Sequence, residues 1–177
     1  MNDVLIGLGS NIGNGLKNLM GAWQRIGQFP EVRLMALSSP YLSSPVGLES
    51  EKWFTNAAGH LRTRLTAIET LELLLEAEQE FGRSRNGTSG YQDRILDLDI
   101  LFFNDMIADD DRLTIPHPRA AERKFVLAPL LEIAPAGFCH PVTGQGLEEI
   151  LAALEKDDRY AGQQLIRKSW PVQESIN

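Results

Sequence analysis

The stretch "YQDRILDLDILFF", residues 91–103, has the pattern of a hydrophobic β-strand with two acidic residues near its start. Alternate side chains of a strand lie on the same face, so Asp97 and Asp99 share one face, about 6–7 Å apart. That face continues with Leu101 and Phe103. The other face is expected to carry Leu96, Leu98, Ile100 and Phe102. Because burying two like charges together is unfavourable, positive groups are expected nearby.

Two carboxylates with this spacing suit a Mg²⁺ site, since Mg²⁺ uses one or two carboxylates together with water and phosphate. The alternative is a solvated strand end with two surface aspartates. Arg83, Arg85 and Arg94 flank a glycine-containing loop beside the pair, and His117 follows in "TIPHP". Arginine binds phosphate oxygens bidentately, so this cluster favours phosphoryl transfer over unrelated surface charges.

Working outward, the order of elements is strand, helix, strand, strand, helix, strand. The strands are expected at 4–8, 32–38, 53–63 and in the opening stretch, and the helices at 16–26 and 66–81. This order predicts an α+β ferredoxin-like βαββαβ sandwich. A short apolar helix or turn in "VLAPLLEIAP" (126–135) and a helix at 146–156 add C-terminal elements. Residues 1–160 are expected to form a single domain and 161–177 a peripheral tail.

The second helix is the clearest element, because Thr66 and Glu69 form a capping box. Its apolar stripe is expected to contain Ile68, Leu71, Leu74, Leu75 and Phe81. Glu78 falls on this stripe, and a buried glutamate needs a partner, for which Arg83 and Arg85 are candidates. A position at the edge of the core is the alternative for Glu78.

A second pocket is indicated by Phe54 and Asn56, which share one face of a strand near "SSPVG". An aromatic ring and an amide suit a flat heterocycle with polar edges. Ordinary core packing is the alternative.

Composition limits the class of protein. The chain has 177 residues and a net charge of −7, with a pI near 5.0, which argues against general nucleic-acid binding. No apolar run has the length of a membrane span, and the N-terminus lacks the basic region of a signal peptide. Cys139 is the single cysteine, so no internal disulfide can form, and it is expected to be inert. These features fit a cytoplasmic protein.

Four separated segments, "LGSNIG", "FTNAA", "RILDLDILFF" and "RLTIPHPRAAERKFVLAPLLEIAP", together resemble the 6-hydroxymethyl-7,8-dihydropterin pyrophosphokinases of folate biosynthesis. The resemblance covers roughly residues 4–136. It implies a ferredoxin-like fold, usually a monomer, and transfer of pyrophosphate from MgATP to the dihydropterin with release of AMP and participation of two Mg²⁺ ions. It implies no nucleic-acid or membrane partner.

The resemblance also implies roles for individual residues. Asp97 and Asp99 match the metal ligands, and the catalytic set adds Arg83, Arg85 and Arg94. The positions implied for ATP binding are Glu78, Arg85, Arg94, Ile100, Arg112, Thr114, His117 and Arg123. The positions implied for pterin binding are Ser43, Ser44, Val46, Phe54, Asn56, Tyr91 and Phe125, with the two phenylalanines on either side of the ring.

The chain departs from the family pattern in "YQDR" (91–94), where Tyr/Trp-Gly-Pro-Arg is usual. Asp93 places a negative charge beside Arg94, and Ser43-Ser44 replaces the usual Thr-Pro. The catalytic loop is one residue longer and carries Asn86 where lysine is frequent. Two other functions therefore stay open: a magnesium-dependent nucleotide hydrolase, and a pterin- or nucleotide-binding module without turnover.

Overall fold

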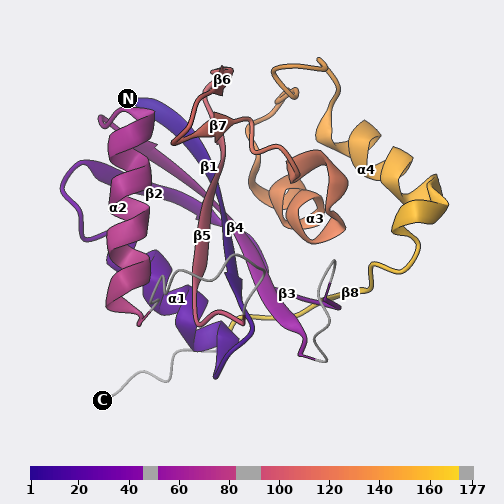
Figure 1. Cartoon of the computed structure of the whole chain (residues 1–177), viewed down its shortest axis with the longest axis horizontal. Helices are drawn as coiled ribbons and strands as arrows, with labels where there is room; N and C mark the ends of the chain where they lie inside the picture. Colours follow the sequence, from indigo (N-terminus) through magenta and orange to yellow (C-terminus); the bar gives the residue numbers. More distant parts are fainter. Residues whose placement is uncertain (46–51, 83–92, 172–177) are drawn as a thin grey trace.

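The computed structural model describes residues 1–45, 52–82 and 93–171 (Figure 1). The main strands are β1 (Asn2–Ser10), β2 (Val32–Leu37), β3 (Tyr41–Ser43), β4 (Phe54–Thr63), β5 (Asp97–Phe103) and β8 (Leu165–Arg167). The helices are α1 (Gly15–Ile26), α2 (Ala67–Glu80), α3 (Lys124–Ile133) and α4 (Leu147–Lys156), with 3₁₀ turns at Ala120–Glu122 and Asp158–Tyr160. The described part of the chain contains no helix long and apolar enough to cross a bilayer.

An antiparallel sheet is the centre of the molecule. Its strand order is β5-β1-β4-β3-β8, and β2 pairs with the other half of β4. A small hairpin of β6 (Ala108–Asp109) and β7 (Thr114–Ile115) lies beside β5. The expected elements of the first 103 residues are all present, in the expected order, and "VLAPLLEIAP" lies in α3.

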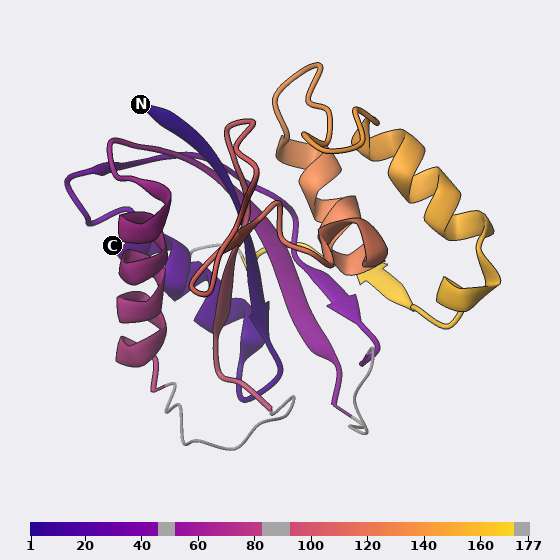
Figure 2. The same cartoon turned by 45° about the horizontal axis from the view of Figure 1, so that its top comes forward.

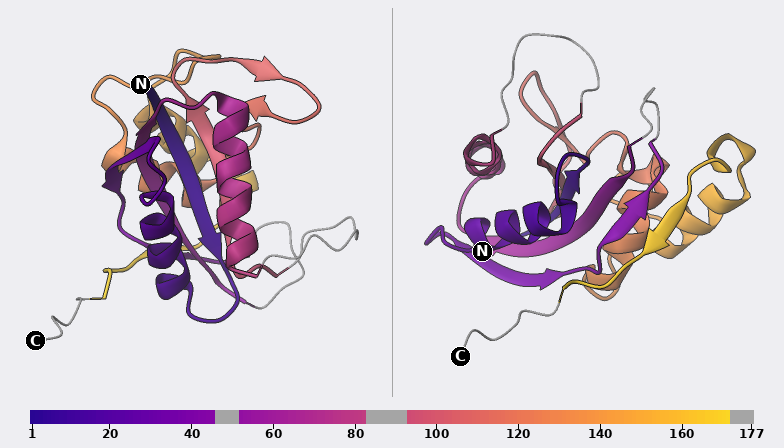
Figure 3. Two further views of the ribbon diagram at one scale, coloured as in Figure 1. Left: turned by 90° about the vertical axis from the view of Figure 1, so that its left-hand side faces the viewer. Right: turned by 90° about the horizontal axis from the view of Figure 1, so that it is seen from below.

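Helices cover both faces of the sheet (Figures 1 and 3). On one face, α1 and α2 form a core with β1, β4 and β5 that includes Ile6, Trp23, Leu61 and Leu74. On the other face, α3 and α4 form a second core with Leu5, Ala58 and Phe102. The sheet is therefore the middle of three layers.

The alternation expected for β5 holds through Leu101, which packs on the α3 and α4 face, and is wrong for Phe102 and Phe103. The pairing with β1 shifts between Leu5 and Ile6, so that Ile6 pairs with Ile100 but Leu5 pairs with Phe102. This β-bulge inserts one extra residue in β5 and exchanges the faces of the residues after it. Phe103 therefore packs with α1 and α2, and Phe102 packs with α3 and α4.

Helix α2 has the predicted capping box. The Glu69 N–H donates to Thr66 Oγ1 at 3.3 Å, and the Thr66 N–H donates to Glu69 Oε2 at 2.8 Å. Of the expected stripe, Leu74 is buried, and Ile68, Leu71 and Phe81 are partly buried against the same core. Leu73 is buried, whereas the expected Leu75 is only partly buried. The buried face consists of Ala67, Thr70, Leu73, Leu74, Ala77 and Glu78.

The segment expected to be a peripheral tail contributes a strand. Residues 165–167 form β8, which pairs with β3 at the edge of the sheet (Figure 2). Trp170 follows and donates its indole N–H to the Ser38 carbonyl oxygen at 2.8 Å. No periodicity in the sequence indicated this pairing, because β8 is short and its partner is more than 120 residues away.

The bulge can be tested by a double-mutant cycle. The Phe102 ring contacts the Phe138 ring edge-on at a centroid distance of 4.9 Å, so Phe102→Ala and Phe138→Ala should couple by ~0.5–1.5 kcal/mol in the free energy of unfolding. Phe103→Ala is the control and should not couple with Phe138→Ala, because Phe103 lies on the opposite face. Equal coupling of both phenylalanines to Phe138, measured by denaturant unfolding, would contradict the bulge.

Candidate active site

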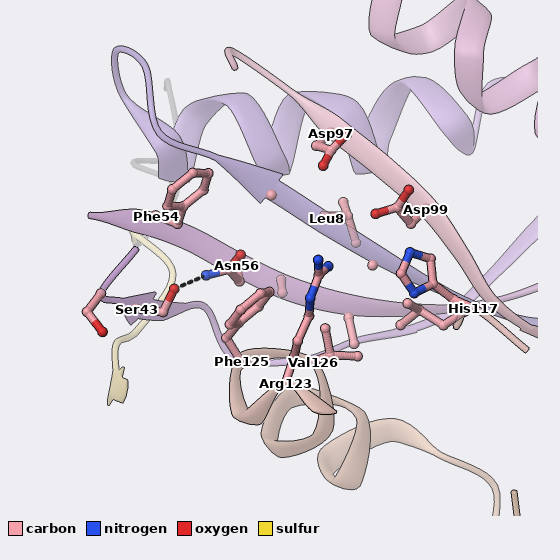
Figure 4. Close-up of a pocket in the computed structure, with 16 residues that line it drawn as sticks. Leu8, Ser43, Phe54, Asn56, Asp97, Asp99, His117, Arg123, Phe125 and Val126 are labelled. Atoms are coloured by element: carbon pink, nitrogen blue, oxygen red, sulfur yellow. Dashed lines mark hydrogen bonds between the residues drawn. The ribbon is translucent and has the colours of Figure 1, made fainter. Parts of the chain in front are cut away.

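A cleft that is partly open to solvent lies on the α3 face of the sheet, and the empty space in and just above it is about 710 Å³ (Figure 4). Its lining comes from β1, β3, β4, β5, the segment before α3 and the first turn of α3. The lining residues are Gly7, Leu8, Gly9, Ser43, Ser44, Phe54, Asn56, Ala57, Ala58, Asp97, Asp99, Leu101, His117, Arg123, Phe125 and Val126. We call the part around Asp97 and Asp99 the acidic end, and the part around Ser43, Phe54, Asn56 and Phe125 the aromatic end.

The sheet register positions the two ends. Gly9 pairs with Asp97 on one side and with Asn56 on the other. Gly7 pairs with Asp99 and with Ala58. A β-carbon on Gly9 would lie 3.5 Å from Asn56 Oδ1 and 3.8 Å from Asp97 Cβ. The absence of side chains on these two β1 residues therefore leaves the floor open between the carboxylates and the amide.

Asp97 is paired with Arg94 at the acidic end. Arg94 Nη1 donates to Asp97 Oδ2 at 2.7 Å, and both side chains are largely buried. The turn after β1 holds this arginine in place. Asn11 Oδ1 accepts the Arg94 N–H at 2.6 Å, and the Asn11 N–H donates to the Arg94 carbonyl oxygen at 3.0 Å. The predicted positive partner of the aspartate pair is thus fixed by backbone contacts as well as by charge.

Asp93, the unusual residue beside Arg94, has partners of its own. Lys52 Nζ contacts Asp93 Oδ2 at 2.6 Å, and Asn11 Nδ2 donates to Asp93 Oδ1 at 2.7 Å. The negative charge of Asp93 is thus balanced by Lys52, while Arg94 contacts Asp97.

Asp99 is the acid of the cleft whose pKa is strongly raised. Burial raises its pKa to about 7, and the negative charges of Asp97 and Glu78 add to the shift, while Arg123 and Arg94 oppose it. Glu78 is 1% exposed, and its Oε1 accepts the Leu98 N–H at 2.7 Å. Because β5 is an edge strand, this bond satisfies a donor on its free edge. Glu78 is a core residue that anchors α2 to the aspartate-bearing strand.

His117 and Arg123 lie across the cleft from the aspartates (Figure 4). The main chain of His117 is tied to β5, since its N–H donates to the Leu101 carbonyl oxygen at 3.0 Å. Burial and the nearby positive charge of Arg123 lower the pKa of His117. The imidazole is therefore neutral at pH 7, and Arg123 provides positive charge on this side of the cleft.

The aromatic end presents rings and an oriented amide. Asn56 is 5% exposed, and its Nδ2 donates to Ser43 Oγ at 2.9 Å. This bond orients the amide so that Oδ1 is directed toward the floor at Gly9. The rings of Phe54 and Phe125 flank this end of the cleft, and Figure 4 shows Phe54 on the β4 side and Phe125 on the α3 side. The Arg123 guanidinium carbon lies 5.5 Å from the centroid of the Phe125 ring.

The structure brings most of the predicted site residues together. Ser43, Ser44, Phe54, Asn56, Asp97, Asp99, His117, Arg123 and Phe125 line the cleft, and Arg94 contacts Asp97. Glu78, Ile100, Arg112 and Thr114 do not line it. Ile100 is buried on the α1 and α2 face, and Arg112 pairs with Glu72 on α2. Val46, Arg83, Arg85, Asn86 and Tyr91 lie outside the described residues.

Other residues of the site were missed by the sequence analysis. Gly7 and Gly9 form the floor, and their alternation in "IGLGS" was the available signal. Asn11 follows β1 in "LGSNIG", where the turn composition gave no sign that it holds Arg94. Lys52 had no signal, because its partner Asp93 is 41 residues away.

The acidic end fits a divalent cation. Two carboxylates face the cleft, the pKa of Asp99 is raised by burial and then by repulsion from Asp97, and Arg94 supplies positive charge to Asp97. Among the residues that the structure describes, no cluster of three or more His, Cys, Asp or Glu could hold a metal by itself. A pair with room for water and phosphate ligands matches the preference of Mg²⁺ rather than that of a fully protein-coordinated ion.

Comparison with known proteins identifies relatives. The profile of the 7,8-dihydro-6-hydroxymethylpterin-pyrophosphokinase (HPPK) family matches residues 5–135. A 2-amino-4-hydroxy-6-hydroxymethyldihydropteridine pyrophosphokinase of Methylorubrum extorquens is 38% identical over 155 residues, which are 88% of this chain and 95% of that protein. A protein of the same name from Bacillus subtilis is 43% identical over 134 residues, which are 75% of this chain and 79% of that protein.

Solved structures share the fold. The Plasmodium falciparum HPPK-DHPS triple mutant crystallised with STZ-DHP superposes with a TM-score of 0.69 over 92% of this chain, at 13% sequence identity. The chain spans about half of that longer protein, 46%. At this identity the likeness supports the architecture of the chain and not its chemistry.

The repulsion at Asp99 predicts a stability change that depends on pH. The folded-state pKa lies above the ordinary value of 3.8, so ionisation of Asp99 lowers stability as the pH rises from about 4 to 7. In metal-free protein, Asp99→Asn should raise the free energy of unfolding by on the order of 2 kcal/mol at pH 8, with the gain disappearing below about pH 4. Asp105→Asn, at an exposed site, is the control. Denaturant unfolding at both pH values measures the effect, and no gain at pH 8 would contradict it.

Proposed function

The chain belongs to the 7,8-dihydro-6-hydroxymethylpterin-pyrophosphokinase family, and we propose that its cleft transfers the pyrophosphoryl group of ATP to 6-hydroxymethyl-7,8-dihydropterin, with release of AMP. One observation carries this proposal: a carboxylate pair suited to MgATP and an amide between two aromatic rings open into the same cleft. A nucleotide hydrolase would have no use for the aromatic end.

In the proposed reaction the hydroxymethyl oxygen of the pterin loses its proton and attacks the β-phosphorus of ATP. The bond between that phosphorus and the oxygen bridging to the α-phosphorus breaks, and AMP leaves. Phe54 and Phe125 hold the pterin ring between them, and the Asn56 amide binds its polar edge. Most of the acceleration then comes from alignment of the two substrates and from electrostatic stabilisation of the phosphates.

We propose that two Mg²⁺ ions accompany ATP and that Asp97 and Asp99 would hold them. When bound, Mg²⁺ polarises the phosphoryl oxygens and lowers the pKa of the attacking hydroxyl. Arg94, His117 and Arg123 surround the same volume and bind phosphate oxygens. Arg83 and Arg85 belong to the same proposed catalytic set and lie outside the described residues.

Four other residues are proposed for ATP binding, and they lie around the free edge of β5: Glu78, Ile100, Arg112 and Thr114. Glu78 contacts the Leu98 N–H on this edge, and Thr114 belongs to β7, which contacts β5. We propose that the adenosine of ATP extends along this edge from the acidic end, near Ile100, Arg112 and Thr114. This arrangement leaves the aromatic end for the pterin.

The strand order supports the finer fold assignment. If β2 and β3 are taken as two halves of one strand beside β4, the order β5-β1-β4-β2/β3 corresponds to the fourth, first, third and second strands of a ferredoxin-like βαββαβ unit. We propose this fold for residues 1–160, with α3, α4 and β8 added to it. We also propose that the protein acts as a monomer in the cytoplasm, which size-exclusion chromatography and cell fractionation can test.

The activity is tested by AMP formation from MgATP with and without 6-hydroxymethyl-7,8-dihydropterin. AMP should form only when the pterin is present. Asp97→Ala should lower turnover at least about 1,000-fold, because a metal ligand is lost, while the circular dichroism spectrum stays unchanged. Asp105→Ala is the control. AMP without pterin would indicate a hydrolase, and pterin binding without AMP would indicate a binding protein.

The ion pair of Asp93 with Lys52 predicts that the unusual "QD" sequence has little effect on rate. Asp93→Asn should change kcat by less than about threefold, since exposed ion pairs contribute little and Arg94 pairs with Asp97. Asn11→Ala should lower kcat about tenfold, because two side-chain bonds are lost: the one that Asn11 Oδ1 accepts from the Arg94 N–H, and the one that Asn11 Nδ2 donates to the Asp93 carboxylate. A tenfold increase in kcat for Asp93→Asn would show that Asp93 weakens the hold of Arg94 on phosphate.

A further inference from the structure

Residues 162–170, which we call the C-terminal strap, run along the outer side of β3 and also contact α3 (Figures 2 and 3). These two elements form the walls of the aromatic end: β3 carries Ser43, and α3 carries Phe125. The strap is C-terminal to residues 5–135, which the family profile matches, and none of the site residues implied by the resemblance lies in it.

On the β3 side, the strap holds the two serines that line the cleft. Leu165 pairs with Ser43, and the Ser44 N–H donates to the Gln164 carbonyl oxygen at 3.1 Å. The Gln164 N–H in turn donates to Ser44 Oγ at 3.0 Å. Ser43 Oγ accepts the bond that orients the Asn56 amide. The strap thus fixes the short strand on which the orientation of Asn56 depends.

On the α3 side, Gln163 acts at the start of the helix. Arg123, the residue before the helix, makes no capping bond with its side chain, and the first N–H groups of a helix lack partners within it. Gln163 Oε1 accepts the N–H of Lys124, the first helical residue, at 2.9 Å. Gln163 Nε2 donates to the Glu122 carbonyl oxygen at 3.1 Å. One side chain therefore fixes the backbone on both sides of Arg123 and directly before Phe125.

The far end of the strap is anchored to the same two elements. Arg167 Nε contacts Glu132 Oε1 on α3 at 2.9 Å, and Arg167 Nη2 donates to Ser39 Oγ before β3 at 2.8 Å. Tyr41 on β3 donates its hydroxyl to Glu132 Oε1 at 2.6 Å. These bonds connect the strap to α3, the strap to the segment before β3, and β3 to α3. The network therefore sets the spacing between β3 and α3, the two walls of the aromatic end.

We propose that the C-terminal strap, through Gln163 above all, is a positioning element that sets the separation and orientation of Phe125, Ser43 and Asn56 for the pterin ring. This inference rests on the proposed function of the cleft. Gln163 acts on the pterin through α3 and is not a catalytic residue. A flat ring held between two aromatic side chains binds well only within a narrow range of ring separation, so a small displacement of the start of α3 lowers pterin affinity selectively.

Gln163→Met in the full-length protein tests the proposal, because it keeps the length of the side chain and removes both of its bonds. Gln164→Met is the matched control, since the bonds of Gln164 described above are made by its backbone. The Kd of 6-hydroxymethyl-7,8-dihydropterin is measured by calorimetry, with and without a non-hydrolysable MgATP analogue. The KM values of both substrates, kcat and the melting temperature are measured alongside.

Gln163→Met should raise the Kd and KM of the pterin about fivefold, the effect of about one hydrogen bond. The KM of MgATP and kcat should change less than twofold, and Gln164→Met should resemble the wild type. Unchanged pterin affinity in Gln163→Met would overturn the proposal, as would an equal loss of affinity for both substrates. If the wild type binds pterin without forming AMP, the proposed function fails, whereas the binding comparison still decides the role of the strap.

Discussion

The burial of the Asp99 carboxylate beside Asp97 is the constraint around which the rest of the site is arranged. Both carboxylates point from β5 into a partly enclosed cleft, and the pKa of Asp99 is raised to about 7 as a result of burial and neighbouring charge. Arg94 balances Asp97 directly, and Arg123 opposes the shift at Asp99. A fold keeps such a pair at a cost in stability, which is reasonable where a bound cation with phosphate relieves the repulsion.

The sheet register joins this local feature to a chemically different region of the same cleft. Gly7 and Gly9 on β1 separate the carboxylates of β5 from the amide and ring of β4. Because antiparallel neighbours lie opposite each other at a fixed spacing, backbone pairing holds the carboxylates of β5 and the Asn56 amide of β4 at a constant distance. Asp93, which differs from the family pattern, lies outside the paired residues of β5, β1 and β4, where its carboxylate contacts Lys52 and Asn11.

The outer sides of two strands that line the cleft, β5 and β3, are covered differently. At β5 the carboxylate of Glu78 accepts the Leu98 N–H from α2. At β3 the free edge is covered by β8, which arrives from the end of the chain. Unpaired strand edges are a source of local flexibility and association. Closing them with α2 and β8 steadies the two strands that carry the aspartates and Ser43.

The sequence by itself determined the elements and the chemical character of the site, because these depend on local patterns. Alternation in "LDLDI" put both carboxylates on one face, and the capping box at Thr66 and Glu69 marked the start of α2. Resemblance supplied the proposed roles of residues such as Phe125, which no periodicity could assign. The tertiary structure alone decided the exchange of Phe102 and Phe103 by a bulge, the pairing of Lys52 with Asp93, and the capping of α3 by Gln163. Each of these depends on contacts between residues distant in the chain, or on register with a neighbouring strand, and such contacts leave no local pattern to read.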